Sequence, residues 1–497
     1  MLASEVPMNQ PVKSAKPQNA ITPTRAEDFP GWYQEVIKAA DMAENAPVRG
    51  CMIIKPYGFA IWENIQQILG GMIKREGVQN AYFPLLIPLN YFSKEAEHVD
   101  GFATECAVVT HHRLVKGPNG GLIPSPDAQL TEPLVIRPTS ETIIGEALSG
   151  WINSYRDLPY KLNQWCNVMR WEMRPRIFLR TSEFLWQEGH NCFETAEEAR
   201  ADALKMLDVY SDFLENYLAL PGIKGEKTAD ERFPGAVATY TIETMMQDGK
   251  ALQTCTSHDL GQTFSKSANI TYQGRDGQQH LAWTTSWGLS TRTIGGLIMT
   301  HGDDDGLILP PKIASQQVTI IPFLKDEADT PKIMESCDKL REMLEVQGIS
   351  TYFDKREERA PTKIWDSIKK GIPLRIEIGA REAAAGEATI VRRDLGKSSS
   401  QTLPVDRVAA DVQSLLGAIQ SNLLEKARTL RDERITNVSS IKDLRDLFAA
   451  DHNGFARLPA SLLDNADLIA VRKEHSLTPR CLPFADKGEF VLIGKSY

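Results

Sequence analysis

The stretch NQWCNVMRWEMRPRIFLRTSEFLWQEGH, residues 163–190, decides the fold, because two strand-like runs lie on either side of a basic loop. The loop, MRPRIFLR, contains a proline, and this pattern predicts a hairpin with a long connection. Side chains alternate along a strand, so residues of one parity share a face. We expect one face of the hairpin to carry Gln164, Cys166, Val168, Arg170 and Glu172 from the first strand and Phe184, Trp186, Glu188 and His190 from the second.

This predicted face has two interpretations. In the first it is a solvated sheet face with cross-strand ion pairs, which would expose Phe184 and Trp186 to water against their usual preference for burial. In the second it is the floor of a site that binds an anion near Arg170 and a flat or apolar group near Trp186. The hairpin by itself leaves both interpretations open.

A Thr-Ser-Glu triplet precedes the hairpin, in VIRPTSETIIGEAL, residues 135–148. The triplet is typical of a helix N-terminus, in which Thr139 or Ser140 caps the helix and Glu141 favours the positive end of the helix dipole. Alternatively, Thr139 and Glu141 face a pocket and hold a small cationic ligand. With Thr139 still extended at the entry to the helix, both side chains can point the same way, so the two roles are compatible.

Two later stretches are also rich in polar groups. In TTSWGLSTRTIGGLIMTHGDDDG, residues 284–306, a helix is predicted with Arg292 in its first turn. A cation at that end is unfavourable unless an anion lies beside it, either a phosphate or an ordinary carboxylate. The second stretch, GKALQTCTSHDLGQTFSK, residues 249–266, offers Gln253, Thr254, Thr256 and His258, where a lone histidine is as readily structural as functional.

The composition sets broad limits. The chain has 497 residues, of which 24% are charged and 42% hydrophobic, as in ordinary globular proteins of several domains. A net charge of −9 argues against a globally basic, nonspecific nucleic-acid binder. Seven dispersed cysteines, no apolar run long enough for a membrane span and no signal-peptide core predict a cytoplasmic protein with reduced thiols.

Common catalytic and nucleotide-binding motifs are missing from the sequence. There is no Ser-His-Asp arrangement, no H-E-x-x-H, no P-loop and no G-x-G-x-x-G that opens a βαβ unit. If ATP binds, it must bind to another architecture.

The chain divides into a tail and three segments. Residues 1–25 are polar and rich in proline and are expected to form a flexible tail. Residues 26–311 form the first domain and end at a pair of prolines. Residues 317–423 alternate strand-like and helical runs, which predicts a small α/β domain. Residues 424–497 open with a charged helix and end in a strand, as a small C-terminal domain.

Taken in order, these motifs resemble the class II aminoacyl-tRNA synthetases, and within that class the prolyl-tRNA synthetase family. The segment GFAIWENIQQILGGMIKREGVQNAYFPLLIP, residues 58–88, is similar to motif 1, a long helix followed by a strand that ends at residues 84–86, and implies a homodimer. The hairpin resembles motif 2, and GLSTRTIGG resembles motif 3. RPTSET and TSHDLGQ are similar to signatures of the prolyl enzymes.

The resemblance implies a fold and a reaction. The fold is an α+β catalytic domain with an antiparallel sheet of six or seven strands, followed by an α/β anticodon-binding domain and a small α+β C-terminal domain. The reaction joins proline and ATP to give prolyl-adenylate and pyrophosphate, and the prolyl group then passes to the 3′ end of tRNA(Pro). This chemistry needs alignment and charge neutralisation rather than a protein nucleophile.

The resemblance also assigns roles to residues. Arg170 would bridge the α-phosphate and the proline carboxylate, and Arg292 would hold the γ-phosphate, so these two are the catalytic candidates. The ATP site would comprise Arg170, Glu172, Arg180, Gln253, Thr256, Ser290 and Arg292, with Mg²⁺ on the phosphates and Gln253 as a possible contact. The proline pocket would comprise Thr139, Glu141, Arg170, Phe184, Trp186, Glu188, His190 and His258. The family has threonine where Ser290 stands, but the hydroxyl is kept.

The chain departs from the usual pattern of the family in three places. Asp354, Arg356, Lys363, Glu377 and Arg381 are candidates for reading anticodon bases, although Pro361-Thr362 replace the usual Gly-Trp. The C-terminal segment has one cysteine where many relatives hold zinc with four, so we expect no zinc. The interval between motifs 2 and 3 has no room for the editing domain of many bacterial relatives, which predicts the archaeal- and eukaryotic-like type.

Two rival hypotheses remain at this stage. A catalytically inactive paralogue could keep the fold and act as a binding or regulatory protein, but the motif arginines are retained here together with Thr139 and Glu141. Another class II synthetase is the second rival, and the two prolyl-like signatures argue against it. ATP–pyrophosphate exchange with each amino acid in turn separates all three.

Overall fold

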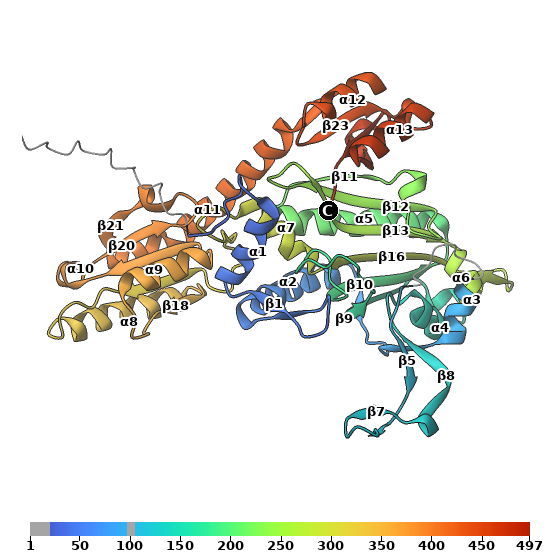
Figure 1. Ribbon diagram of the computed structural model, residues 1–497, viewed down its shortest axis with the longest axis horizontal. Coiled ribbons are helices and arrows are strands. Elements are labelled where there is room, and N and C mark those ends of the chain that lie inside the picture. Colours follow the sequence, from blue (N-terminus) through green and yellow to red (C-terminus); the bar gives the residue numbers. More distant parts are fainter. Residues whose placement is uncertain (1–19, 97–104) are drawn as a thin grey trace, which may run out of the picture.

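The computed structural model describes residues 20–96 and 105–497 (Figure 1). The expected tail lies outside the described residues as far as residue 19. Residues 20–25 do not form a free tail, because the backbone N–H of Ile21 donates to the Asp304 carbonyl at 2.9 Å and Arg25 pairs with the Asp304 carboxylate.

The elements of residues 29–96 lie at two places beside the main sheet (Figure 1). They are α1 (Phe29–Ala39), β1 (Ala43–Asn45), β2 (Met52–Ile54), α2 (Pro56–Arg75), β3 (Gln79–Asn80), β4 (Leu86–Pro88) and α3 (Leu89–Ala96). In Figure 1, α1 and α2 lie toward the left, and α3 lies at the right beside α4 (Glu141–Trp151). The strand expected at the end of motif 1 is wrong in length: β3 has two residues, and residues 81–85 form no strand. Pro84 has no N–H for a ladder, and Gln164 and Arg137 instead bind the backbone of Phe83.

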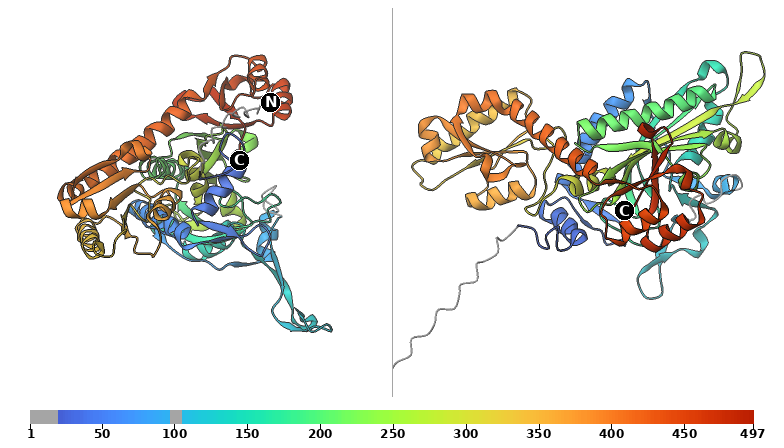
Figure 2. Two further views of the ribbon diagram at one scale, coloured as in Figure 1. Left: turned by 60° about the vertical axis from the view of Figure 1, so that its left-hand side comes forward. Right: turned by 90° about the horizontal axis from the view of Figure 1, so that it is seen from above.

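A long ribbon projects from the body of the molecule (Figure 2). It is built from β5 (Val108–His111), β6 (Leu114–Lys116), β7 (Leu122–Pro124) and the start of β8 (Gln129–Ile136). β8 leads directly into α4 (Glu141–Trp151), so the Thr-Ser-Glu triplet lies where the strand meets the helix.

The main sheet has eleven strands in the described part of the chain, in the order β22-β23-β25-β24-β11-β12-β13-β16-β10-β9-β3. Its central strands are β9 (Tyr160–Met169), β10 (Glu183–Phe193), β11 (Gly222–Glu226), β12 (Ala238–Met245), β13 (Ala251–Gly261) and β16 (Trp283–Ser290). Neighbours among these six are antiparallel, whereas β3 joins β9 in parallel. The six antiparallel strands agree with the antiparallel sheet that the resemblance implied, and β3 adds a parallel seventh strand.

The hairpin of β9 and β10 has the predicted parity. Trp186 lies opposite Cys166, and Glu188 lies opposite Gln164. The other face is covered by α5 (Ala196–Asn216), which begins with the capping box Thr195–Glu198 and buries its apolar side against the sheet. Gly189 is required on that face, because a Cβ atom there would lie 2.1 Å from the Trp287 ring.

Three further elements complete this region. They are α6 (Thr263–Ala268), the small hairpin β14 (Thr271–Gln273) and β15 (Gln279–Leu281), and α7 (Arg292–His301). The helix predicted after residue 290 is confirmed as α7, which buries Ile294, Leu297 and Ile298 in the core.

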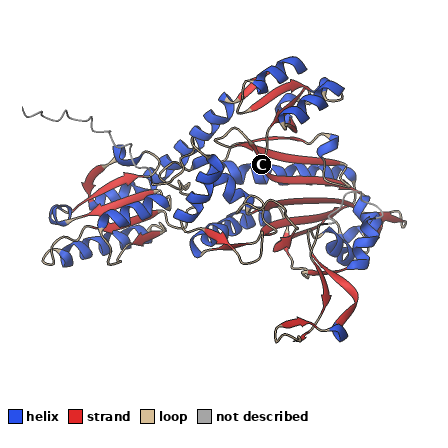
Figure 3. Cartoon of the chain, viewed as in Figure 1, coloured by secondary structure: helices blue, strands red, loops and turns tan. Residues whose placement is uncertain are grey.

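Residues 317–423 contain a separate five-stranded sheet with helices against it (Figures 1 and 3). The elements are β17 (Val318–Pro322), α8 (Thr330–Val346), β18 (Thr351–Phe353), α9 (Ala360–Lys369), β19 (Leu374–Ile378), α10 (Ala380–Ala385), β20 (Glu387–Arg392) and β21 (Gln401–Pro404). The alternation of strands and helices expected from the sequence is confirmed.

The C-terminal part differs from the expectation at its boundary. α11 (Val405–Glu433) is one helix of 29 residues, so the expected division at residues 423–424 falls inside it. It leads to β22 (Ile435–Asn437), α12 (Ile441–Ala449), β23 (Phe455–Pro459), α13 (Ala466–His475), β24 (Thr478–Pro483) and β25 (Phe490–Gly494). β24 pairs with β11, so these strands extend the main sheet.

Candidate active site

A cavity of about 240 Å³ lies over the sheet face opposite α5. It brings together most of the residues expected in the site: Thr139, Glu141, Arg170, Phe184, Trp186, Glu188, His190, Gln253, Thr256, His258, Ser290 and Arg292. They come from the start of α4, from β10, β13 and β16, and from the segments after β9 and β16. The solvated-face interpretation of the hairpin is therefore wrong.

The Thr-Ser-Glu triplet is directed at this cavity. α4 begins at Glu141 with Ser140 as its N-cap, yet the Ser140 side chain forms no capping hydrogen bond. Its hydroxyl instead donates to Oε1 of Glu188 at 2.5 Å, and the Thr139 hydroxyl donates to Oε2 of Glu141. Side-chain capping is therefore the wrong interpretation, because both hydroxyls bind carboxylates of the site.

Glu188 lies at the centre of a buried polar network. It accepts hydrogen bonds from Ser140 and from Nε2 of Gln164 at 2.9 Å, and Nε2 of His190 lies 3.0 Å from its Oε2. Burial by itself would raise the pKa of Glu188, but His190, Ser140 and Gln164 hold this pKa below its usual value. Glu188 is therefore a stable anion in the floor of the cavity.

His258, unlike Glu188, is held in its uncharged form. Burial and the neighbouring His190 lower the pKa of His258 to about 3, so its ring is neutral at physiological pH. Its Nδ1 atom lies 3.0 Å from Oγ1 of Thr239. A neutral ring at this position contributes shape and a hydrogen bond rather than charge.

Arg170 lies just after the end of β9. Its Nε donates to the carbonyl of Pro138 at 2.9 Å, and its guanidinium lies 5.6 Å from the Phe184 ring centre and 5.4 Å from that of Trp186. Burial lowers the pKa of Arg170, while the charges of Glu141 and Glu188 oppose that change. The arginine is thus fixed between aromatic rings and attracted to two carboxylates.

Arg292 is the first residue of α7, as predicted. Its Nε donates to the carbonyl of Leu179 at 3.1 Å. Burial and the charges of Arg180 and Arg170 lower the pKa of Arg292 to about 10. The charge of Glu243 opposes that change, so a carboxylate does act on Arg292, and the three arginines together favour an additional anionic ligand.

Glu172 and Arg180 are the two expected site residues that do not line the cavity. They lie in the loop between β9 and β10, where Nε of Arg180 is 3.8 Å from Oε2 of Glu172. The Arg180 side chain is half exposed.

A loop that the sequence did not single out also lines the cavity, through Glu231, Arg232 and Phe233. The Phe233 ring lies 4.7 Å from that of His258, and its backbone N–H donates to Oγ1 of Thr239 at 2.9 Å. The loop is also tied to the C-terminal region, because Arg472 of α13 pairs with Asp230 at 3.2 Å. ERFPGA, with its Pro-Gly turn, was the available sequence signal.

The C-terminal residues reach the edge of this region. The backbone N–H of Tyr497 donates to the Ala251 carbonyl at 3.1 Å, and its hydroxyl donates to Asp248 at 2.6 Å. The Arg176 guanidinium, from the loop between β9 and β10, lies 6.0 Å from the Tyr497 ring centre. The terminal residues thus contact the start of β13 and face the loop that carries Arg180.

The anticodon candidates divide into two groups. Asp354 and Lys363 are buried, and Nζ of Lys363 donates to the Asp354 carbonyl at 3.0 Å. Arg356 bridges the carboxylates of Asp354 and Asp366 and is half exposed. Glu377 and Arg381 line a separate surface cavity of about 500 Å³. Burial thus makes Asp354 and Lys363 structural, contrary to the expectation that they read bases.

The described residues show no metal centre. In residues 20–96 and 105–497, no group of three His, Cys, Asp or Glu side chains is arranged to hold an ion. Cys481 is buried beside Phe455 and Leu492. Among the described helices, none is long and apolar enough to cross a membrane.

Comparison with known proteins supplies two matching family models. Residues 126–301 match the tRNA synthetase class II core domain (G, H, P, S and T), and residues 317–415 match the anticodon binding domain. The first match contains every residue that lines the cavity, and the second coincides with the five-stranded sheet.

Curated relatives extend the similarity to nearly the full chain. The proline--tRNA ligase of Bdellovibrio bacteriovorus is 51% identical over 488 residues, which cover 96% of this chain and 97% of that protein. That of Novosphingobium aromaticivorans is 52% identical over 519 residues, which cover 99% of this chain and all of that protein. That of Akkermansia muciniphila is 51% identical over 481 residues, 95% of each.

Proposed function

Because the chain belongs to the proline--tRNA ligase family of class II aminoacyl-tRNA synthetases, we propose that its 240 Å³ cavity is the site of proline activation. The enzyme joins proline to ATP and then charges tRNA(Pro). In the first step a carboxylate oxygen of proline attacks the α-phosphorus, and the bond to the departing pyrophosphate breaks. In the second step the 3′-terminal hydroxyl of the tRNA attacks the carbonyl carbon, and AMP leaves.

The observation that carries the assignment is the pairing of opposite charges in one cavity. Glu141 and Arg170 both line it, and the charge of Glu141 acts on the Arg170 guanidinium. Proline is a zwitterion, so its ammonium group suits Glu141 and its carboxylate suits Arg170. The rings of Phe184 and Trp186 beside Arg170 offer an apolar wall for the pyrrolidine ring.

The nucleotide would occupy the arginine side of the cavity. Arg170 would contact the α-phosphate, and Arg292 would hold the γ-phosphate at the N-terminus of α7, where the dipole also favours anions. Gln253, Thr256 and Ser290 would border the nucleotide, as lining residues of the same cavity. Glu172 and Arg180, which pair with each other in the hairpin loop, would contact the adenine and the phosphates.

A magnesium ion would bind chiefly to the phosphates of ATP. Mg²⁺ often keeps few protein ligands and binds through substrate oxygens, which fits the lack of an acidic cluster among the described residues. Gln253 is the lining residue that we propose as a contact, and the ion would neutralise the charge of the triphosphate.

The smaller domains have proposed roles as well. We assign anticodon binding to residues 317–423, with Arg356, Glu377 and Arg381 as the surface candidates. We also propose a homodimer through motif 1, because Phe59, Tyr82 and Leu86 leave apolar side chains exposed on that segment. Residues 424–497 are proposed to form a zinc-free C-terminal domain.

The subtype and location remain proposals. The interval from His190 to Thr284 is occupied by α5, β11–β15 and α6, all part of the catalytic region. This supports the archaeal- and eukaryotic-like type without an inserted editing domain. Seven free cysteines support a reducing, cytoplasmic location. Proline-dependent ATP–pyrophosphate exchange tests the activity, and exchange that depends on another amino acid would refute it.

A further inference from the structure

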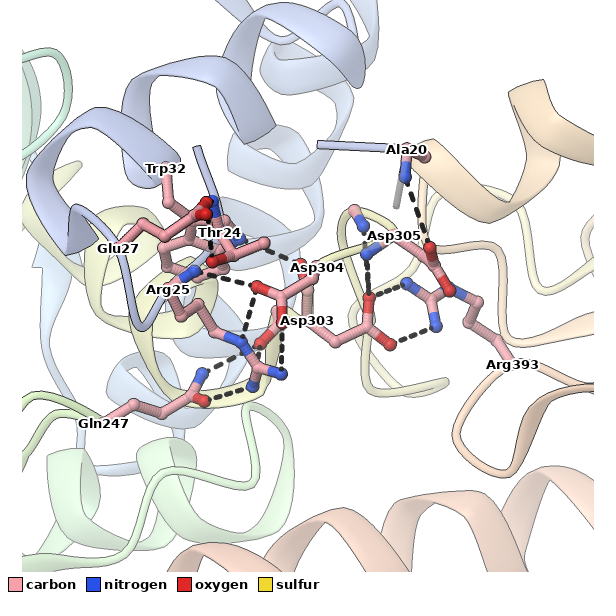
Figure 4. A network of polar contacts seen from close by, with 12 residues as sticks. Ala20, Thr24, Arg25, Glu27, Trp32, Gln247, Asp303, Asp304, Asp305 and Arg393 are labelled. Atoms are coloured by element: carbon pink, nitrogen blue, oxygen red, sulfur yellow. Dashed lines mark hydrogen bonds and ion pairs between the residues drawn. The ribbon is translucent and has the colours of Figure 1, made fainter. Parts of the chain in front are cut away.

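Three consecutive aspartates follow α7, and each binds a different part of the molecule (Figure 4). Asp304 pairs with Arg25, and Oδ1 of Asp305 accepts the backbone N–H of Ala20 at 3.4 Å. Asp303 binds Arg393, which lies directly after β20 in the anticodon-binding domain. The loop after α7 thus joins the catalytic region to two segments distant in sequence.

The Asp303–Arg393 pair has two hydrogen bonds. Nη1 of Arg393 donates to Oδ2 of Asp303 at 2.8 Å, and Nη2 donates to Oδ1 at 2.6 Å. The Arg393 side chain is 7% exposed and that of Asp303 30%. A bidentate pair with a buried arginine fixes both distance and orientation, unlike an exposed single contact.

On the anticodon-binding side, Arg393 is held by a helix that leads to the base-reading candidates. Its Nε donates to the carbonyl of Ile368 at 3.0 Å, near the C-terminal end of α9. At the other end of α9 lies the loop of Arg356, whose Nη1 donates to Asp366 of the same helix. A shift of this loop on tRNA binding would therefore move the helix that orients Arg393.

On the catalytic side, Asp303 follows α7 by two residues. Its backbone carbonyl accepts a hydrogen bond from Nε1 of Trp32 in α1 at 2.9 Å, which holds the end of α7 against α1. Gly306 allows the close approach of the two domains, because a Cβ there would lie 2.6 Å from Cα of Lys369 in α9. A helix of ten residues spans about 15 Å, so α7 connects Asp303 to Arg292 in the cavity.

We propose that the Asp303–Arg393 ion pair couples the position of the anticodon-binding domain to that of α7, and so orients α7 for the transfer of proline to bound tRNA. Both residues are positioning residues, because neither lines the cavity. The inference rests on the proposed site in one respect, the placement of Arg292 on the nucleotide. It requires that loss of the pair affect the step that uses tRNA more than the step that does not.

The test compares two activities of the full-length enzyme. Asp303→Asn and Arg393→Lys are each expected to lower kcat/KM for charging tRNA(Pro) by about tenfold, which is about 1.4 kcal/mol. Proline-dependent ATP–pyrophosphate exchange without tRNA is expected to stay within about twofold of the unsubstituted enzyme. The double variant should be no worse than the more impaired single variant, because both changes remove one interaction.

Two matched controls lie beside the pair. Arg392→Lys alters a bidentate ion pair with Asp394 inside the anticodon-binding domain, and Asp304→Asn alters the neighbouring pair with Arg25. Both are expected to leave the ratio of charging to exchange unchanged, and thermal unfolding confirms that all variants are folded.

Three results would overturn the proposal: unchanged charging in both variants, an equal loss of charging and exchange, or the same selective loss in Arg392→Lys. Each of these results compares a variant with the unsubstituted enzyme and concerns only the Asp303–Arg393 pair. The proposed function would be refuted by a different result, namely that the unsubstituted enzyme fails to catalyse proline-dependent exchange.

Discussion

The hydroxyl of Thr139 donates a hydrogen bond to the carboxylate of Glu141 at the start of α4, and both side chains line the cavity. This contact explains why a threonine precedes the helix without capping it. It orients a carboxylate toward the space that we assign to the ammonium group of proline.

Glu141→Gln should therefore weaken proline binding more than folding. The substitution keeps the size of the side chain but removes the charge, and hydrogen bonds to charged groups contribute about 1.5–3 kcal/mol. We expect kcat/KM for proline in ATP–pyrophosphate exchange to fall by about 10- to 100-fold. Glu146→Gln, on the exposed side of the same helix, is the control and should have little effect. If Glu141→Gln loses stability and keeps its proline affinity, Glu141 is only a structural residue.

Arg472→Ala tests whether the C-terminal domain steadies the loop over the proline side of the cavity. Arg472 pairs with Asp230, three residues before Phe233, and Asp230 is half exposed. Because exposed pairs contribute about 0.2–1 kcal/mol, KM for proline should rise by about two- to fivefold at most, with KM for ATP unchanged. Arg445→Ala, which removes the Arg445–Glu474 pair of the same domain, should change neither constant. A rise in both constants would show general destabilisation instead.

His301 should make the fold sensitive to acid. Burial lowers the pKa of His301 to about 4 in the folded protein, whereas an unfolded histidine titrates near about 6.5. Between these values the unfolded chain binds the extra proton, so the free energy of unfolding falls as pH falls, by up to about 1.4 kcal/mol per pH unit.

Urea denaturation at several pH values between about 4 and 7 measures this slope. His301→Gln should be less sensitive to acid than the unsubstituted protein over that range, whatever its stability at pH 7. Parallel pH profiles for the two proteins would show that His301 does not carry this dependence.

The proposed type without an inserted editing domain predicts imperfect discrimination against alanine. Burial of the extra carbons of proline separates it from alanine by only about 1–3 kcal/mol. We expect measurable alanine-dependent exchange and no hydrolysis of Ala-tRNA(Pro) by the purified enzyme. An intrinsic deacylase activity would contradict this prediction.

Local patterns in the sequence were sufficient to predict which residues form the floor of the site. Strand parity put Trp186, Glu188 and His190 on one face, and the register opposite Cys166 and Gln164 confirms it. Helical periodicity likewise placed Arg292 at the start of a buried helix. In both cases the geometry follows from repeats within one element.

Features that depend on distant contacts could not be predicted in this way. The loop of Phe233 becomes part of the site through Thr239, His258 and Arg472, the last of which is 242 residues from Asp230. Lys363 looked like a surface cation, yet its amine is buried against the Asp354 carbonyl. The boundary after residue 423 failed because two helical patterns without a break form one helix, α11.

ATP–pyrophosphate exchange with each amino acid in turn tests the central claim most directly. The account predicts strong exchange with proline, weak exchange with alanine and none with threonine or glycine. Absence of exchange with every amino acid would indicate a catalytically inactive relative, and threonine- or glycine-dependent exchange would show that the cavity serves another substrate.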